Sequence, residues 1–275
     1  MTDTGQSSIT VLGVPFDAHS SYLRGPAEAP PLIRDALYSD SANLWSETGV
    51  DLGADGVLHI AGDLMIQNSE TAFSEIRSAV AGLLESDTIP LILGGDHAIT
   101  YPVLQAFSKK YPRIHVLHFD AHPDLYDSLD GDRLSHACPF ARVMEDGLCQ
   151  RLVQVGVRTL NGHQRAQAER FGVEIHAMKD WTEDAPISFD TPVYLSFDVD
   201  ALDPAFAPGV SHFEPGGLST RQALSVIQRL EAPAILGADV VEFNPRRDAS
   251  GMTAMVCAKI VKEIAGKIRI LSSVS

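Results

Sequence analysis

Two carboxylates and an imidazole recur at every second position in the stretch Asp120-Ala-His-Pro-Asp124. The residues before it, Arg113–Phe119, form an apolar run that predicts a buried strand. In an extended backbone, side chains two residues apart point to the same side, so Asp120, His122 and Asp124 are expected to converge. Burying these groups without a cation is costly. Taken alone, the cluster could instead be explained by hydrogen bonds to loop backbone.

Similar polar residues follow three other predicted strands, and this favours the cation. In parallel sheets, ligands bind at the carboxyl ends of the strands, so residues just after different strands are expected to share one pocket. The residues that follow the three strands are Gly94-Gly-Asp-His97 after Ile89–Leu93, Asp198-Val-Asp200 after Val193–Phe197, and Glu242 after Ala234–Val241.

The kind of ion follows from these side chains, which are mostly carboxylates. Repulsion among buried carboxylates requires compensating positive charge. Zinc prefers four ligands and often thiolates, whereas oxygen-rich sets suit octahedral ions, with manganese the natural choice. The sequence therefore predicts two divalent ions that share bridging aspartates. The candidate ligands are His97, Asp120, His122, Asp124, Asp198 and Asp200.

Eight β-branched, apolar runs alternate with segments of helical period along the whole chain. This alternation predicts an α/β fold with a parallel sheet covered by helices on both faces. The pattern does not distinguish an open sheet from a closed barrel. No break in composition divides the chain, so residues 1–275 are expected to form one domain. The predicted strands are Ile9–Pro15, Leu58–Ala61, Ile89–Leu93, Arg113–Phe119, Leu152–Val157, Val173–His176, Val193–Phe197 and Ala234–Val241.

Helix boundaries have their own signals. Apolar residues share one face in Asn68–Glu85, which Asn68 or Ser69 could cap. The sequence Ser219-Thr-Arg-Gln222 has the form of a capping box that opens a helix over Thr220–Leu230. A further helix is predicted over Met252–Ile264.

Composition excludes several classes of protein. The chain has 275 residues, 45% of them hydrophobic, and a formal net charge of -15. A nucleic-acid surface would require a basic face, whereas an acidic field favours a cationic ligand. The first ten residues lack a secretory signal, and no apolar run reaches the ~18–20 residues needed to span a bilayer. With three cysteines that lack CxxC spacing, we expect a cytoplasmic protein with free thiols and no membrane or nucleic-acid partner.

Three blocks of this sequence resemble the signature motifs of the ureohydrolase family, the arginases and agmatinases. These blocks are Gly94-Gly-Asp-His97, Asp120-Ala-His-Pro-Asp124 and Ser196-Phe-Asp-Val-Asp-Ala-Leu-Asp-Pro204. The resemblance runs nearly end to end and is strongest to plant-type arginases and bacterial agmatinase-like proteins. The further matching segments are Gly13–Asp17, Ser20–Pro26, Ser135–Phe140, Pro208–Ser219 and Asp239–Pro245.

The resemblance implies an open eight-stranded sheet and assembly as trimers or hexamers. It implies a hydrolase with two Mn²⁺ ions that cleaves the guanidino group of L-arginine to urea and an amine. The alternative substrates are agmatine and 4-guanidinobutyrate, and the alternative metals are Co²⁺, Ni²⁺ and Fe²⁺. A more remote alternative is a metal-dependent binding protein without catalytic activity.

The resemblance also implies roles for individual residues. One ion would be held by His97, Asp120, Asp124 and Asp198, and the second by Asp120, His122, Asp198 and Asp200. Asp124 would thereby belong to the catalytic machinery. Glu242 would orient the guanidinium, and His136 would pass protons to the leaving amine. Asn161 and Ser128 would contact the tail of the substrate.

Four further polar positions have simpler interpretations. His118 shares strand parity with Asp120, and a core histidine is favoured over one that orients a ligand. Asp203 precedes a proline and is expected to accept bonds from nearby backbone N–H groups. His212 departs from most agmatinases, which have threonine there. His19 and the other histidines outside the motifs are expected to be structural or on the surface.

Overall fold

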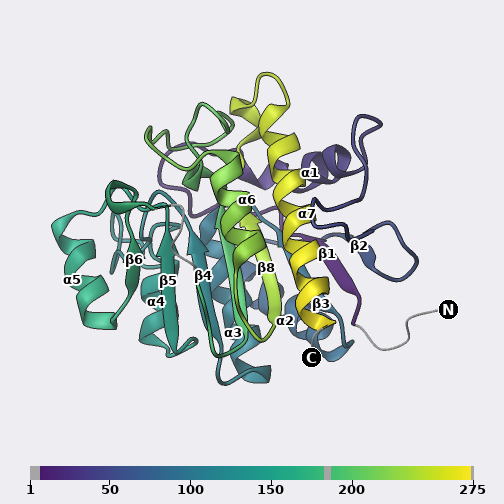
Figure 1. The fold of residues 1–275 in the computed structure, drawn as a ribbon. Coiled ribbons are helices and arrows are strands. Elements are labelled where there is room, and N and C mark those ends of the chain that lie inside the picture. Colours follow the sequence, from purple (N-terminus) through teal and green to yellow (C-terminus); the bar gives the residue numbers. More distant parts are fainter. Residues whose placement is uncertain (1–6, 183–186, 274–275) are drawn as a thin grey trace.

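The computed structural model describes residues 7–182 and 187–273, which form one parallel sheet between two layers of helices (Figure 1). The strand order is β2-β1-β3-β8-β7-β4-β5-β6, and β2 and β6 are the edges, so the sheet is open. All eight predicted strands are present, with boundaries shifted by a few residues. They are β1 Ile9–Gly13, β2 Leu58–Asp63, β3 Ile89–Leu93, β4 His115–Phe119, β5 Arg151–Val155, β6 Glu174–His176, β7 Val193–Asp198 and β8 Ile235–Val241.

Helices cover both faces of the sheet. The α helices are α1 Ala29–Leu37, α2 Ala72–Glu85, α3 Thr100–Lys110, α4 Pro139–Glu145, α5 Gly162–Phe171, α6 Thr220–Arg229 and α7 Met252–Ser272. Helices α1, α6 and α7 contribute to one hydrophobic core, and α2 to α5 contribute to the other. Within β4, Leu117 faces the first core and Val116 the second, which explains why the central strands are apolar throughout.

The helix signals in the sequence were partly correct. The capping box of Ser219 and Gln222 is present at the start of α6. Helix α2 begins at Ala72, later than predicted, because the side chain of Asn68 accepts a bond from Thr71 N–H in the turn before the helix. Helix α7 continues beyond the predicted end at Ile264, with Ile268 buried in its last turns.

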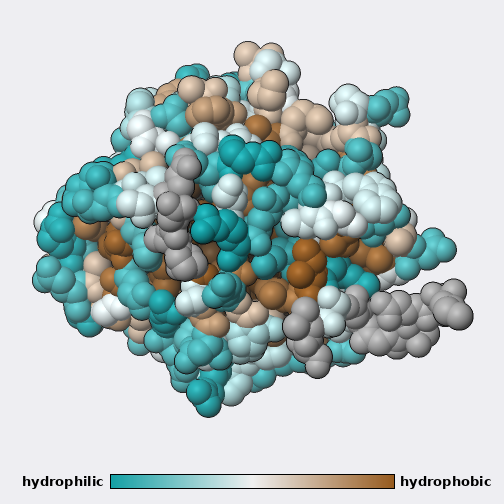
Figure 2. Space-filling model, viewed as in Figure 1, coloured by the Kyte–Doolittle hydropathy of each residue, from teal (hydrophilic) through white to brown (hydrophobic). Residues whose placement is uncertain are grey.

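Short 3₁₀ helices follow several strands and loops, and two of them lead out of the strands that carry candidate ligands. They are η1 Pro26–Glu28, η2 His97–Ile99, η3 Met178–Asp180, η4 Val199–Ala201 and η5 Pro245–Arg247. In the part of the chain that is described, no helix is both long and apolar enough to cross a bilayer. Hydrophilic residues predominate on the face in Figure 2, and hydrophobic residues are exposed in smaller patches between them.

Candidate metal centre

Four strands that are neighbours in the sheet, in the order β3, β8, β7 and β4, position the candidate site. The candidate ligands lie at the ends of β3, β7 and β4, and Glu242 follows β8. His97 opens η2 after β3, and Asp198 and Asp200 lie at the end of β7 and in η4. The chain therefore brings residues about a hundred positions apart to one edge of the sheet. All six candidate ligands are buried except His122, whose side chain is 24% exposed.

The first group of side chains surrounds the imidazole of His97. Its Nδ1 lies 3.1 Å from an oxygen of Asp124, 3.1 Å from one of Asp198 and 3.3 Å from one of Asp120. Ligand atoms of His97, His118, Asp120 and Asp124 lie within 4.8 Å of one another, close enough to hold a metal ion.

A second group shares Asp120 with the first. The Nδ1 atom of His122 lies 3.1 Å from Asp200 Oδ2 and 3.3 Å from Asp120 Oδ1, and these three residues could also hold a metal ion. The other oxygen of Asp120 faces His97, so this carboxylate lies between the two groups. Asp198 is tied to the same loop, because its Oδ1 accepts a bond from Asp200 N–H at 2.7 Å.

The hydrogen bonds of His97 test whether a cation fits. Its Nε2 lies 2.9 Å from Ser196 Oγ, and Ser196 donates its own hydroxyl proton to Asp239 at 2.6 Å. In the neutral imidazole, Nε2 must therefore donate to Ser196, and Nδ1 carries the lone pair. This Nδ1 is buried and has no hydrogen-bond partner among the described residues. A lone pair that faces three carboxylates is repelled unless a cation lies between them, so the donor set fits a metal.

A proton is the other cation that could occupy this position. Burial lowers the pKa of His97, but the carboxylates of Asp120, Asp124 and Asp198 outweigh burial and hold the pKa well above its ordinary value. Burial raises the pKa of Asp198, as does the neighbouring Asp200. The site therefore attracts positive charge from whichever source is available.

His118 contacts the candidate ligand Asp120, which makes the favoured interpretation of a simple core histidine incomplete. It is fully buried, as predicted, but its Nε2 lies 2.9 Å from Asp120 Oδ2, and Gln154 lies 3.0 Å from its Nδ1. Such partners fix the orientation of a coordinating carboxylate. The Asp203 prediction is confirmed: its carboxylate accepts from the N–H groups of Ala205, Gly216 and Gly217.

The backbone around the site is closely packed and in places strained. A side chain at Gly95 would overlap the carbonyl oxygen of Phe16, so the second glycine of Gly94-Gly-Asp-His97 is needed for a close approach. Asp124 and Glu242 have φ angles of 51° and 64°, which residues with side chains rarely adopt. Strain of this kind is concentrated at functional sites.

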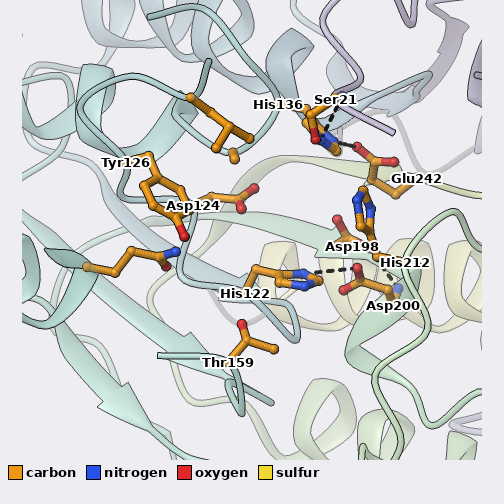
Figure 3. Close-up of a pocket in the computed structure, with 13 residues that line it drawn as sticks. Ser21, His122, Asp124, Tyr126, His136, Thr159, Asp198, Asp200, His212 and Glu242 are labelled. Atoms are coloured by element: carbon orange, nitrogen blue, oxygen red, sulfur yellow. Dashed lines mark hydrogen bonds and ion pairs between the residues drawn. The ribbon is translucent and has the colours of Figure 1, made fainter. Parts of the chain in front are cut away.

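Glu242 and His136 form a buried pair beside the ligands (Figure 3). Glu242 Oε1 accepts from His97 N–H at 2.9 Å and lies 2.7 Å from His136 Nδ1. Burial lowers the pKa of His136, but the Glu242 carboxylate outweighs it and raises the pKa to about 9. Burial raises the pKa of nearby Asp96 to about 7, and the charge of Glu242 adds to that rise.

A cavity of about 220 Å³ opens onto these groups. Its walls include the candidate ligands His122, Asp124, Asp198 and Asp200, and also Glu242 and His136. The remaining lining residues, most of which the sequence did not single out, are Ser21, Tyr126, Leu129, Ala137, Thr159, Gln164 and His212. Ser21 and His212 lie in segments that resemble the ureohydrolase family. Nothing in the sequence marks Gln164 as a residue of the site.

The two predicted tail contacts lie outside this lining. Asn161 caps α5, where its Oδ1 accepts from Gln164 N–H, and its Nδ2 donates to the hydroxyl of Tyr126 at 2.6 Å. Asn161 thus supports a wall of the cavity through Tyr126. Ser128 is exposed, two residues after Tyr126 in the loop beyond β4.

Comparison with known proteins agrees with this geometry. A family model described as the Arginase family matches residues 7–266. Arginase 1, mitochondrial, of Arabidopsis thaliana is 47% identical over 96% of this chain and 82% of its own length. The solved arginase of Medicago truncatula superposes with a TM-score of 0.92 at 43% identity, covering 95% of this chain and 87% of that one. A hypothetical agmatinase from Burkholderia thailandensis gives 0.85 at 31% identity, covering 96% and 86%.

The comparisons contradict the expected cytoplasmic location and settle the family. The Arabidopsis relative and others from rice and Medicago truncatula are named as mitochondrial, so that expectation is wrong. It depended on the three unpaired cysteines and on the lack of a secretory signal in the first ten residues, and that lack does not distinguish cytosol from organelles. The family model spans nearly the whole chain, and the shared fold carries buried His and Asp clusters where that family predicts metal ligands. This chain belongs to the arginase family.

Proposed function

We propose that this protein hydrolyses the guanidino group of L-arginine to give urea and an amine. The observation that carries the proposal is the pair of buried ligand groups joined by Asp120, which open onto a cavity beside Glu242 and His136. The 47% identity to an Arabidopsis protein named arginase supports the choice of arginine.

The proposed cofactor is a pair of Mn²⁺ ions. His97, Asp120, Asp124 and Asp198 would hold one, and Asp120, His122, Asp198 and Asp200 the other, with Asp120 and Asp198 shared. The donors are mainly carboxylate oxygens, which favours Mn²⁺ over zinc, although Co²⁺, Ni²⁺ and Fe²⁺ tolerate the same donors. When bound, two such ions would supply a strong nucleophile from water at neutral pH and would stabilise the charge on the oxygen that attacks the guanidinium carbon.

The proposed role of Glu242 is to orient the substrate. Its side chain is buried and lines the cavity, and its Oε1 already accepts from His97 N–H and lies beside His136. Oε2 is therefore the oxygen that would accept from a guanidinium N–H. A charge-assisted bond at a buried carboxylate fixes both the position and the rotation of the planar group.

The proposed role of His136 is to move a proton. Cleavage of the carbon–nitrogen bond leaves an amine that needs a proton, and His136 lies in the cavity wall with a pKa raised to about 9 by Glu242 after burial has opposed it. Glu242 holds Nδ1, so the ring keeps its orientation when the proton leaves from Nε2. This arrangement is that of a general acid.

The walls of the cavity favour a cationic substrate. No lysine or arginine is among its described lining residues, and Glu242 would keep its negative charge while the proposed ions offset those of Asp124, Asp198 and Asp200. An arginine substrate would place its tail toward Tyr126, Leu129 and Gln164. Asn161 would influence the substrate tail through its hydrogen bond to Tyr126. Ser128 would contact the tail only if the loop that carries it moved toward the substrate.

Agmatine is the second candidate substrate, with 4-guanidinobutyrate as a third. Agmatine lacks the α-carboxylate of arginine, and no cationic side chain lines the described cavity wall to bind such a carboxylate. The similarity to the hypothetical Burkholderia agmatinase is consistent with this alternative.

We also propose that residues 1–275 act as one domain and that the protein assembles as a trimer or hexamer. The single sheet, with one continuous core on each face, supports the first part. Size-exclusion chromatography with light scattering would test the second part.

The test is urea release from arginine, agmatine, 4-guanidinobutyrate and guanidine after incubation with Mn²⁺. We expect arginine to give the highest kcat/KM. A higher value for agmatine would move the assignment to the second candidate. Bound metal without urea release from any of the four would instead support a non-catalytic binding protein.

A further inference from the structure

Both ring nitrogens of His136 have partners (Figure 3). Nδ1 lies 2.7 Å from Glu242 Oε1, and a carboxylate oxygen accepts, so Nδ1 carries a proton. Nε2 lies 2.9 Å from Ser21 Oγ and 3.2 Å from Ser21 N. Ser21 is therefore the residue that meets the nitrogen from which a proton would leave.

Ser21 can serve His136 in both protonation states. When the ring is neutral, Nε2 has a lone pair, and both the backbone N–H and the hydroxyl of Ser21 can donate to it. When the ring is protonated, Nε2–H can donate to the hydroxyl oxygen, because a hydroxyl rotates to donate or accept. Glu242 accepts from Nδ1 throughout. The ring can thus gain and lose a proton without losing its second anchor.

The segment that carries Ser21 is held against the segment that carries His136. The backbone N–H of His136 donates to the carbonyl of His19 at 3.1 Å, and the His19 ring lies 2.6 Å from Asp132. The backbone N–H of His19 donates to Asp96 at 3.0 Å. Ser21 itself is exposed, but it lies two residues after His19, which these bonds hold in place, and it lines the cavity.

We propose that Ser21 is a positioning residue that keeps His136 aligned through its proton cycle. This inference depends on the proposed function of His136 as the proton donor. The hydroxyl supplies a partner for Nε2 in both protonation states, and the backbone N–H supplies a second one when the ring is neutral. Nothing in the sequence motif distinguishes Ser21 from Ser20, and the assignment comes from the contact across 115 positions of the chain.

The experiment uses the full chain, loaded with Mn²⁺ and assayed with arginine. The Ser21→Ala variant keeps the N–H and loses the hydroxyl, and we expect kcat to fall roughly tenfold, a fraction of what a positioned proton donor contributes. We expect KM within about twofold of the wild-type value and unchanged metal content, because Ser21 touches neither the ligands nor Glu242. Ser21→Thr restores a hydroxyl and should recover most of the kcat.

Two further variants isolate the contact. Ser20→Ala is the matched control for the loop, because its hydroxyl lies 3.3 Å from Asp96 and away from His136, and wild-type kcat is expected. In the His136→Ala background, adding Ser21→Ala should not lower kcat further, since Ser21 acts through the His136 ring. A further loss in that double variant would overturn the proposal.

The remaining outcomes separate this inference from the proposed function. A wild-type kcat in Ser21→Ala, with His136→Ala impaired, would reject the role of Ser21 alone. In Ser21→Ala, a higher KM with unchanged kcat would show that Ser21 binds the substrate, and a loss of metal would show that it supports the structure of the site. Either result would reject the positioning role. Full activity in His136→Ala, or no urea from the wild type, would reject the proposed function first.

Discussion

Two clusters of carboxylates among the described residues differ in whether a lysine or arginine supplies permanent positive charge. Between the loop after α1 and helices α6 and α7, Glu47 lies 2.6 Å from Arg221 and 3.1 Å from Lys259. Glu263 is buried, and it accepts from Lys259 at 2.8 Å and from Gln228 at 2.9 Å. In this paired network, each carboxylate has a lysine or arginine within contact distance.

The carboxylates at the strand ends have histidines as their described ion-pair partners. The pKa values of Glu47 and Asp198 illustrate the difference, although within the strand-end cluster the burial of Asp120 is outweighed by hydrogen bonds from His118, His122 and His97, which lower its pKa. The Arg221 hydrogen bond lowers the pKa of Glu47 to about 2, whereas burial raises the pKa of Asp198 well above its ordinary value. The paired network is complete without a ligand, and the strand-end cluster is arranged for a cation from outside the chain.

The strongest test of this contrast removes one carboxylate from the strand ends. We expect Asp124→Ala to abolish measurable turnover and to lower metal content, because Asp124 is a proposed ligand that faces His97 at 3.1 Å. Elemental analysis and urea release provide the two measurements. Glu47→Gln is the matched control and should keep both metal and activity. Full metal content in active Asp124→Ala would reject the ligand assignment.

The next largest effect is expected at His136, which lies beside the ligands without being one. We expect His136→Ala to lower kcat by about 10²- to 10⁴-fold, the range for a positioned proton donor. Metal content should stay at the wild-type level, and elemental analysis of the same preparation checks it. Loss of metal would instead identify His136 as part of the first group of ligands.

Much of the strand-end cluster could be predicted from local sequence. The period-two spacing of Asp120, His122 and Asp124 is a property of extended backbone, and the strands were visible as apolar runs between helical segments. The strand order β3-β8-β7-β4 was not visible, because pairing depends on packing between distant segments. The expectation that the ligands converge came from the general rule for parallel sheets, and the observed order explains why they can.

The contacts around the ligands could not be predicted, for the same reason. Ser21 and His136 meet across 115 positions, and Ser196 reaches Asp239 across 43. His118 was favoured as a core residue although it shares strand parity with Asp120, and its distance to Asp120 identifies a second role. Local periodicity gives the direction of a side chain, whereas the partner depends on the tertiary fold.

A smaller effect, on metal affinity, is expected at Ser196, which contacts the candidate ligand His97. Ser196→Ala removes the acceptor of His97 Nε2 and leaves the buried Asp239 carboxylate with Thr100 and Tyr194 as its hydroxyl partners. Losing such a partner of a metal-binding histidine costs about 10- to 100-fold in metal affinity. Titration with Mn²⁺ in a competition assay measures this. Ser196→Thr, which keeps a hydroxyl, is the matched variant, and equal affinity in Ser196→Ala and wild type would show that the contact is not needed.

The smallest effect is expected in the paired network, where Glu47→Gln should lower stability at pH 7 by about 0.2–1 kcal/mol, the range for partly exposed pairs. The pKa of Glu47 is lowered from its ordinary value of 4.5 to about 2, so its contribution is present above pH 4.5 and is lost as the pH falls toward 2. Chemical denaturation of wild type and variant at pH 7 and pH 3 should therefore show a difference that shrinks with acid. High salt should reduce the same difference, since Arg221 is exposed. A difference that stays constant with pH and salt would mean that Glu47 stabilises the loop through packing, and the contrast between the two clusters would then not be one of charge.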